Sequence, residues 1–401
     1  MLSVDEARAR IMAPLSPTPA EMVALPEAWG RVLAAPVVAR LTQPPADMSA
    51  MDGYALRAVD GLVGARLKVV GHAPAGRPFI GQVAGGEAVR LFTGSVVPDG
   101  ADAVLAQEDV DRTDDWIAVR EVAQPGRHIR RAGQDFSQGD SLVPSGTRLG
   151  ARSIGLIAAG NHPWVMVHRQ PRIGILATGD EVVLPGEPLA AGGIVSSNAH
   201  ALAALVRAGG GAPVVLPIAP DDPAAIAAVA DRISGIDLLV TTGGASVGDH
   251  DLVQASLGTR GFALDFWRIA MRPGKPLLFG RLGDVPVLGL PGNPVSAFVC
   301  AVLFLLPALA RLAGLMDGGL PTVEARLGAP VAANDHRADH LRAMLVTDAA
   351  GVLVATAFER QDSSLLRLLA GAGCLILRPP YAPALLAGAP VSVVHLDTLG
   401  L

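Results

Sequence analysis

The sequence predicts a multidomain α/β protein whose central domain is a doubly wound, mostly parallel sheet covered by helices on both faces. Residues 171–316 alternate short apolar runs with helical segments, which is the pattern of a parallel sheet with helical connections. The regions on either side carry short extended runs separated by Gly and Pro, which predicts smaller β-rich domains.

The central region supplies its elements in a regular order. Strand-like runs are followed by helix signals, such as Gly209 after one helical segment and Asp222 capping another that begins at Pro223. Ligands of such sheets bind outside the carboxyl ends of the strands. The expected strands are residues 172–178, 213–217, 236–240, 262–269, 276–279 and 286–290, and the expected helices are residues 196–208, the segment from 223 and the segment from 294.

The flanking regions give the other domains. Helical patterns, clearest at residues 4–12 and 151–159, predict a connecting arm with a β-rich domain inserted in it. Extended runs return after residue 320 and predict a C-terminal β-domain. The expected domains are 2–40 with 137–168 (the arm), 41–136 (the β-rich domain), 170–317 (the α/β domain) and 320–401 (the C-terminal domain).

Composition narrows the class of protein. Of the 401 residues, 50% are hydrophobic but only 4% are aromatic, so the core must be built from Ala, Val, Leu and Ile. A formal net charge of −5 gives no basic field, so we expect no nucleic-acid partner. Cys300 and Cys374 lie in apolar runs and are interpreted as buried thiols. These thiols, with an N-terminal segment that lacks an apolar signal core, predict a cytoplasmic protein.

One uncharged segment, residues 285–310, has to be compared with a membrane span, which needs about 20 apolar residues. Pro291, Asn293 and Pro294 punctuate its start, and Pro307 interrupts its end. We therefore expect a strand, a turn and a buried helix, and no membrane association.

The most informative loop, TTGGASVGDHD at residues 241–251, follows an apolar strand. Backbone N–H groups of such a glycine-rich loop can hold an anion, and Asp249 and Asp251 can hold a hard cation beside it. The TGDE run at residues 178–181 follows the first strand and offers a second carboxylate pair. Read alone, that run is also a common solvated turn.

Other groups could complete an anion site. Asp221 could reach the same strand ends, whereas Asp222 is explained by its capping role. Arg268, Arg272 and Lys275 surround a Pro-Gly turn and are suited to oxyanions. The LPGNPVSAF run at residues 290–298 starts a helix, and its free N–H groups can bind an anion, although a rigid turn explains the run equally well.

Three motifs of the β-rich region are SAMDGYA (residues 49–55), FTGS (92–95) and IRRAGQD (129–135). Each is a turn or a solvated loop when it is read alone. Together with the TGDE, TTGGASVGDHD, RPGKP and LPGNPVSAF runs, they resemble the molybdopterin molybdenumtransferase family in order and spacing. Bacterial MoeA and the E domain of gephyrin belong to that family.

The resemblance implies an elongated protein of four parts with a C-terminal β-barrel-like domain. It implies transfer of molybdenum from molybdate to adenylylated molybdopterin, with Mg²⁺ assistance and release of AMP. It implies a homodimer whose active site lies between the α/β domain of one subunit and the β-rich domain of its partner. Transient contacts with a molybdopterin adenylyltransferase and with molybdoenzyme chaperones are also expected.

The resemblance carries over site residues that match the family motifs. The expected catalytic residues are Asp52, Asp135, Asp180, Glu181, Asp221 and Asp251, of which Asp180, Glu181 and Asp251 are the expected metal ligands. The expected substrate-binding residues are Thr93, Thr178, Gly243, Gly244, Ser246, Gly248, Arg268, Arg272, Lys275, Pro291, Gly292, Asn293, Pro294 and Ser363.

The chain departs from the family pattern at several positions. Family members often have lysine where this chain has Arg268 and Arg272, and a QGS run where it has Gln361, Asp362 and Ser363. These departures are also compatible with a specialised paralogue. Two further functions stay open, namely a nucleotide hydrolase or deamidase built on the same α/β domain, and a non-catalytic binding scaffold.

Overall fold

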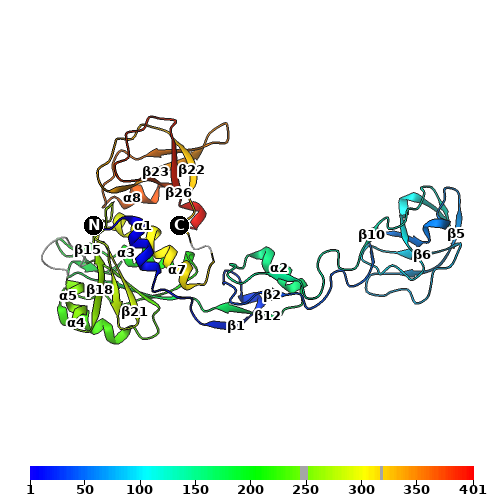
Figure 1. Cartoon of the computed structure of the whole chain (residues 1–401), viewed down its shortest axis with the longest axis horizontal. Helices are drawn as coiled ribbons and strands as arrows, with labels where there is room; N and C mark the ends of the chain where they lie inside the picture. Colours follow the sequence, from blue (N-terminus) through cyan, green and yellow to red (C-terminus); the bar gives the residue numbers. More distant parts are fainter. Residues whose placement is uncertain (244–251, 317–318) are drawn as a thin grey trace.

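The computed structural model describes residues 1–243, 252–316 and 319–401. The molecule is elongated (Figure 1). The α/β domain and the C-terminal domain lie together at one end, close to both chain termini, and a narrow arm leads to the β-rich domain at the other end.

The α/β domain contains a six-stranded sheet in the order β16-β13-β17-β21-β20-β18. Strands β16, β13, β17 and β21 are parallel, and β20 and β18 add antiparallel pairs at one edge, so the prediction of a mostly parallel sheet is confirmed. The strands are β13 (Arg172–Ala177), β16 (Ala212–Val215), β17 (Leu238–Thr242), β18 (Phe262–Trp267), β20 (Leu278–Leu282) and β21 (Val285–Leu290).

Helices cover both faces of this sheet because its strand residues alternate between two cores. Leu238 and Val240 of β17 belong to one apolar cluster, whereas Leu239 between them belongs to another. The first cluster is completed by α3 (Asn198–Ala208) and the helix that begins at Pro294. The second is completed by α4 (Pro223–Ala227) and α5 (Leu252–Gly258).

The apolar segment after Pro294 is a core helix. It consists of α6 (Pro294–Cys300), a π-helical segment (Ala301–Leu305) and α7 (Leu306–Leu312). Within the described residues it is the one helix long and apolar enough to cross a membrane, but 78% of that stretch is buried inside the protein. The prediction that Pro307 interrupts the helix was wrong, since the π-helical segment immediately before it lets the helix continue to Leu312.

The arm is built mainly from strand pairs rather than from helices. Strand β1 (Ala20–Ala24) pairs with β12 (Trp164–His168), and β2 (Val37–Val38) pairs with β11 (Ser141–Val143). Of the two helices predicted for the arm, α2 (Ala151–Ala159) packs there. The other, α1 (Val4–Met12), instead shares the core of the α/β domain, since its apolar face contacts α7.

The β-rich domain is one sheet in the order β7-β4-β6-β5-β9-β8, entered and left through the paired strands β3 (Met48–Ser49) and β10 (Ile129–Arg130). That pairing explains how a domain can be inserted within the arm. Its strands are β4 (Gly53–Leu56), β5 (Arg66–Ala73), β6 (Glu87–Leu91), β7 (Ala103–Ala106), β8 (Val110–Thr113) and β9 (Trp116–Val119).

The C-terminal domain is a closed barrel of β23, β24, β22, β26 and β25, because β25 pairs back onto β23. Strand β19 (Met271–Arg272) of the α/β domain also pairs with β23 and fastens the barrel to that domain. Helix α8 (Leu366–Ala370) contacts α6. The barrel strands are β22 (Val323–Leu327), β23 (Ala338–Thr347), β24 (Leu353–Ala357), β25 (Cys374–Arg378) and β26 (Pro390–His395).

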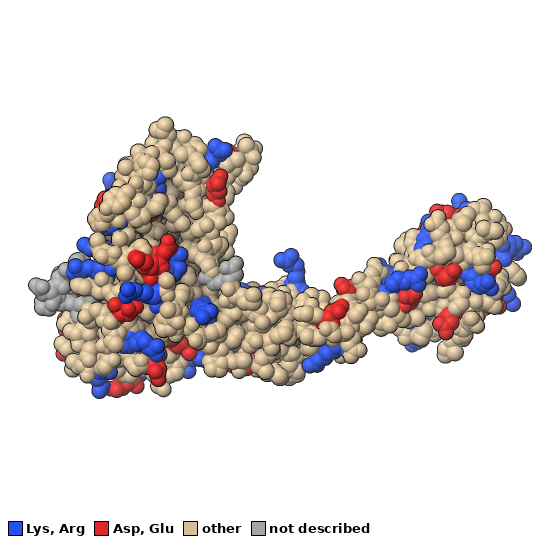
Figure 2. Space-filling view, viewed as in Figure 1, with Lys and Arg blue, Asp and Glu red and all other residues tan. Residues whose placement is uncertain are grey.

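Three further features are the cysteines, the surface charges and the short 3₁₀ turns. Cys300 and Cys374 are buried and unbonded, as predicted, and burial raises the pKa of both thiols. Acidic and basic side chains are interspersed over the face seen in Figure 2, without a patch of one sign. Short 3₁₀ turns lie at Leu25–Glu27, Ala58–Asp60, Gln107–Asp109, Ala228–Arg232 and Asp397–Leu399.

Candidate active site

A cavity of about 670 Å³ lies at the carboxyl ends of β13, β17 and β21, where an α/β sheet binds its ligands. The short parallel strands β14 (Val182–Val183) and β15 (Ile194–Val195) form one wall, and the start of α6 forms another. Seven residues predicted from the sequence line this cavity: Thr178, Glu181, Gly243, Pro291, Gly292, Asn293 and Pro294.

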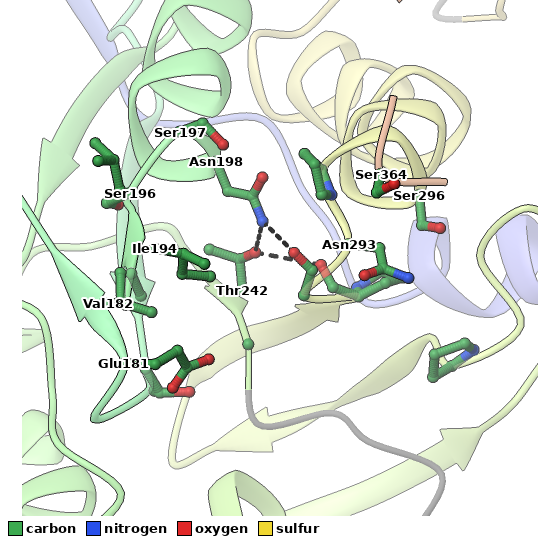
Figure 3. Close-up of a pocket in the computed structure, with 18 residues that line it drawn as sticks. Glu181, Val182, Ile194, Ser196, Ser197, Asn198, Thr242, Asn293, Ser296 and Ser364 are labelled. Atoms are coloured by element: carbon green, nitrogen blue, oxygen red, sulfur yellow. Dashed lines mark hydrogen bonds between the residues drawn. The ribbon is translucent and has the colours of Figure 1, made fainter. Parts of the chain in front are cut away.

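One amide side chain holds three walls of the cavity together. Asn198, at the start of α3, donates from Nδ2 to Thr242 Oγ1 and to the Gly292 carbonyl, each at 2.8 Å (Figure 3). Thr242, the last residue of β17, in turn donates to the Pro291 carbonyl at 3.3 Å. Because each of these groups has a partner, the ends of α3, β17 and β21 keep a fixed spacing.

Thr178 places a hydroxyl in the cavity wall without a hydrogen-bond partner in the described chain. The residue is 2% exposed, and its Oγ1 is fully buried. Gly243 lies against it with φ +95°, and a Cβ at Gly243 would come within 2.4 Å of the Thr178 carbonyl oxygen. Glycine is therefore required at 243, and Thr178 Oγ1 is a buried hydroxyl of the cavity wall without a partner in the described chain.

The two acidic residues after β13, Asp180 and Glu181, line two neighbouring depressions. Glu181 lines the main cavity, whereas Asp180 lines an adjoining depression of about 650 Å³. The backbone N–H of Asp221 donates to Asp180 Oδ1 at 3.0 Å, so the loop after β16 reaches this edge as predicted. Asp222 accepts from Ala225 N at 2.8 Å and caps α4, which confirms its structural role.

The start of α6 is engaged by the C-terminal domain. Asn293 Nδ2 donates to Ser363 Oγ at 2.9 Å, and the Val295 N–H donates to the Ser363 carbonyl at 3.1 Å. Pro294 has no N–H, so the first N–H group of this helix is already used by the protein. The segment around Ser363 thus closes the cavity, and Ser364 lines it.

None of the three predicted cationic side chains, Arg268, Arg272 and Lys275, lines the cavity. Arg268 has φ +76° and stacks on the ring of Trp267 at 3.8 Å from its centroid. Arg272 donates to Asp335 of the C-terminal domain at 2.6 Å. Lys275 is half-buried and immediately precedes Pro276, which lines the cavity. Of the three, Lys275 lies nearest in sequence to a cavity residue.

The predicted residues of the β-rich domain lie at the far end of the molecule (Figure 1). Asp52 accepts from the N–H and the Oγ1 of Thr93, at 2.7 and 2.8 Å, and the Thr93 N–H is the main cause of the lowered pKa of Asp52. The side chain of Asp135 is exposed. Within one chain, these residues do not meet the cavity of the α/β domain.

Several predicted groups lie outside the described residues, namely Gly244, Ser246, Gly248, Asp249 and Asp251. In the part of the chain that the structure describes, no three His, Cys, Asp or Glu side chains cluster as a metal site. Asp180 and Glu181 are therefore the described carboxylates of the predicted metal site.

Six polar residues of the cavity were not among the predicted site residues, namely Ser196, Ser197, Asn198, Thr242, Ser296 and Ser364. Thr242 could have been found, because it is a polar residue at the carboxyl end of an otherwise apolar strand. Asn198 and Ser296 lie in the first turns of helices, where a polar residue is ordinarily explained by helix initiation.

The fold and this pocket define a protein with a molybdopterin-binding α/β domain. Residues 174–311 match the description "Probable molybdopterin binding domain". Residues 2–160 match "MoeA N-terminal region (domain I and II)", and residues 324–396 match "MoeA C-terminal region (domain IV)". The chain belongs to the molybdopterin molybdenumtransferase family, a family of enzymes of molybdenum cofactor biosynthesis, which confirms the resemblance in its motifs.

Individual relatives and a solved structure from the same family are similar to this chain over most of its length. The chain is 38% identical to a molybdopterin molybdenumtransferase of Haemophilus influenzae, over 78% of both chains. It is 36% identical to molybdopterin molybdenumtransferase 2 of Mycobacterium tuberculosis, over 93% of this chain and 94% of that one. The crystal structure of a molybdopterin biosynthesis MoeA protein from Pyrococcus horikoshii superposes with a TM-score of 0.86 at 28% identity, covering 98% and 100% of the two chains.

Proposed function

We propose that this chain transfers molybdenum from molybdate to adenylylated molybdopterin and releases AMP. The observation that carries the proposal is the cavity at the carboxyl ends of β13, β17 and β21, in a chain that belongs to the transferase family. Its volume lies within the range of small-molecule and cofactor sites, which is roughly 300–1,000 Å³.

Neutral polar groups give this cavity its means of recognising a heterocycle. Asn198 and Thr242 are fully engaged with each other and with backbone carbonyls, so they set the shape of the cavity. Thr178 Oγ1 is buried without a partner in the described chain. A buried unpaired hydroxyl costs about 1–3 kcal/mol, and a hydrogen bond from a bound pterin ring would remove that cost.

Magnesium is proposed at the edge formed by Asp180 and Glu181. These two exposed carboxylates are adjacent in the sequence after β13 and line neighbouring depressions, and Mg²⁺ in phosphate-handling sites is held by one or two carboxylates together with substrate phosphate oxygens. The donor set therefore fits the ion, with Asp251 as the third proposed ligand. When bound, Mg²⁺ supplies charge neutralisation at the phosphate from which AMP departs.

Cationic side chains are proposed to hold the oxyanions. Lys275 is half-buried beside the cavity, and no ion pair engages it within the described residues. Arg272 is paired with Asp335, so binding an anion requires it to exchange that partner. Arg268 stacks on Trp267, which leaves the guanidinium positive and oriented. We therefore assign Lys275 the largest part in oxyanion binding.

A homodimer is proposed because Asp52, Thr93 and Asp135 lie far from the cavity of their own chain (Figure 1). A second copy could bring its β-rich domain to the cavity. Thr93 fixes the orientation of the Asp52 carboxylate through two hydrogen bonds, and an exposed carboxylate held in this way is ready for a partner's site. Two equivalent sites would then form in each symmetric dimer.

The cellular compartment of the reaction and the proteins that exchange substrate and product with the enzyme are also proposed. We propose that the enzyme works in the cytoplasm, where buried thiols such as Cys300 stay reduced. Adenylylated molybdopterin would pass to it through transient contact with the adenylyltransferase, and the product would pass to molybdoenzyme chaperones. Both contacts can be measured by binding of the purified proteins in the presence and absence of substrate.

The direct test uses the purified full chain with adenylylated molybdopterin, molybdate and MgCl₂. Released AMP is measured by chromatography, and the product is measured by activation of an apo-molybdoenzyme. The Glu181→Gln variant should lose most of both signals, whereas Asp284→Asn, at a fully exposed turn away from the cavity, should keep them. No AMP release from folded wild-type chain would refute the proposal.

A cellular test separates the transferase from the other three functions. The chain should restore molybdoenzyme activity at low molybdate in a host that lacks its own transferase. Restoration only at high molybdate, or none with the folded protein present, would favour a specialised paralogue or a scaffold. Adenylyl hydrolysis that continues without molybdate and yields no cofactor would favour a nucleotide hydrolase.

A further inference from the structure

The C-terminal domain contributes Ser364 to the wall of the active-site cavity, and residues 361–363 lie directly before it. Ser364 lines the cavity close to Asn293 and Ser296 (Figure 3). Ser363 is bound on two sides, since its hydroxyl accepts from Asn293 at 2.9 Å and its carbonyl accepts from the Val295 N–H at 3.1 Å. The segment is therefore held against the start of α6, with Ser364 facing the cavity.

Asp362 places an exposed carboxylate directly beside this wall, hydrogen-bonded to the lining residue Ser364. Its Oδ1 accepts from the Ser364 N–H at 2.8 Å and from the Ser364 hydroxyl at 2.6 Å. Its backbone is not left-handed, so a side chain is accommodated there without strain. The hydroxyl hydrogen of Ser364 is consequently directed to Asp362, and it is not available to a ligand in the cavity.

A buried cation lies behind the same segment. Arg342 is 0% exposed, and Gln361 Oε1 accepts from its backbone N–H at 3.0 Å and from its Nε at 3.3 Å. Its Nη1 is buried without a hydrogen-bond partner in the described chain. Burial lowers the pKa of Arg342, and the charge of Asp362 opposes that shift. Hydrogen bonds from Ser364 lower the pKa of Asp362, with Arg342 contributing, so Asp362 is ionised at neutral pH.

This arrangement joins the positive charge of the buried Arg342 with the negative charge of Asp362, which is bonded to a residue of the cavity wall. Asp362 is exposed, and its charge is partly screened by water. It offsets the field of Arg342 and repels an approaching dianion such as molybdate. A glycine at the same position would leave that field uncompensated and would free the Ser364 hydroxyl.

We propose that Asp362 is a specificity-determining residue that weakens the binding of tetrahedral oxyanions to this pocket through its negative charge. The inference rests on the proposed function, since it concerns the same cavity. A charge effect of the size seen for exposed ion pairs corresponds to about a two- to fivefold change in affinity. The enzyme would thus need a higher molybdate concentration than its own Asp362→Gly variant.

Two substitutions separate charge from hydrogen bonding. Asp362→Asn keeps an acceptor oxygen for Ser364 and removes the charge, whereas Asp362→Gly removes both. Asp348→Asn is the matched control, because Asp348 is also exposed and accepts from two backbone N–H groups, of Ala350 and Val352, in the β23–β24 turn of the same barrel. Neither Asp348 nor its two partners line the cavity, whereas Asp362 is hydrogen-bonded to the lining residue Ser364.

The experiment titrates molybdate into the full-length proteins by calorimetry at low and high ionic strength, and it measures KM for molybdate and kcat by AMP release. Both Asp362 variants should bind molybdate about two- to fivefold more tightly than wild type and Asp348→Asn, with a lower KM, and the gap should narrow at high salt. Unchanged affinity, or tightening in Asp362→Gly alone, would overturn the inference while wild-type AMP release still supports the proposed function. Absence of both molybdate binding and AMP release in wild type would overturn both proposals.

Discussion

Asn198 donates a hydrogen bond of 2.8 Å to the hydroxyl of Thr242, and this contact joins the first turn of α3 to the last residue of β17. The same nitrogen also donates to the Gly292 carbonyl in the turn before α6. One neutral amide therefore fixes the three strand and helix ends that enclose the cavity.

Replacing Asn198 by Ala should loosen the cavity. Two hydrogen bonds are lost, while Thr242 keeps its bond to Pro291, so the free energy of unfolding should fall by about 1–2 kcal/mol. The rate of AMP release should fall as well, because the cavity loses its fixed shape. Urea unfolding measures the first effect, with His200→Ala, an exposed position on the same helix, as the control. Equal stability of the two variants would show that the amide is dispensable.

Replacing Thr178 by Val should weaken substrate binding without lowering the stability of the fold. The change removes a buried hydroxyl that has no partner in the described chain, so the free energy of unfolding should stay the same or rise by about 1 kcal/mol. The affinity for the pterin substrate should fall. Thr178→Ser, which keeps the hydroxyl, should bind substrate nearly as well as wild type. If the Val variant kept wild-type KM, Thr178 would have no role in substrate binding.

The proposed dimer predicts complementation between two inactive variants. Asp52→Asn damages the β-rich half of a site, and Glu181→Gln damages the α/β half. In a mixed dimer, one of the two sites receives both intact halves, so random mixing should restore about a quarter of wild-type activity. AMP release after mixing by denaturation and refolding measures this. No recovery from correctly refolded, mixed dimers would place each site within a single chain.

His340 should make the stability of the enzyme depend on pH. It is buried, and burial lowers its pKa from 6.5 to about 4. Between these values the unfolded chain binds a proton that the folded chain does not, so stability is complete above pH 6.5 and is lost as the pH falls toward 4. About 2 kcal/mol should be lost between pH 7.5 and pH 5.

Chemical denaturation of wild type and His340→Gln at the two pH values checks this. The variant should lose about 2 kcal/mol less than wild type over the same interval, because the other titrating groups are common to both proteins. An equal pH dependence of the two proteins would mean that His340 is protonated in the folded state.

Much of the fold could be predicted because local sequence patterns specify its helices and strands. The apolar run at β17 and the Asp222–Pro223 cap of α4 lie where the sequence indicates them. The arm was harder to predict. Residues 20–24 and 164–168 form a strand pair across a long sequence separation, and no local signal of either segment specifies that pairing.

The residues of the candidate site also fall into two groups, those that sequence motifs indicate and those that only the fold brings to the cavity. The sequence by itself determined the turn residues at the strand ends, such as Thr178, Gly243 and Asn293, because motifs of glycine, proline and polar residues mark those turns. Only the tertiary structure decided that Asn198 and Ser364 join them, and that Arg272 pairs with Asp335 of the barrel. The physical reason is that hydrogen bonds and ion pairs depend on distances between segments remote in sequence, which the packing of the α/β domain against the barrel sets.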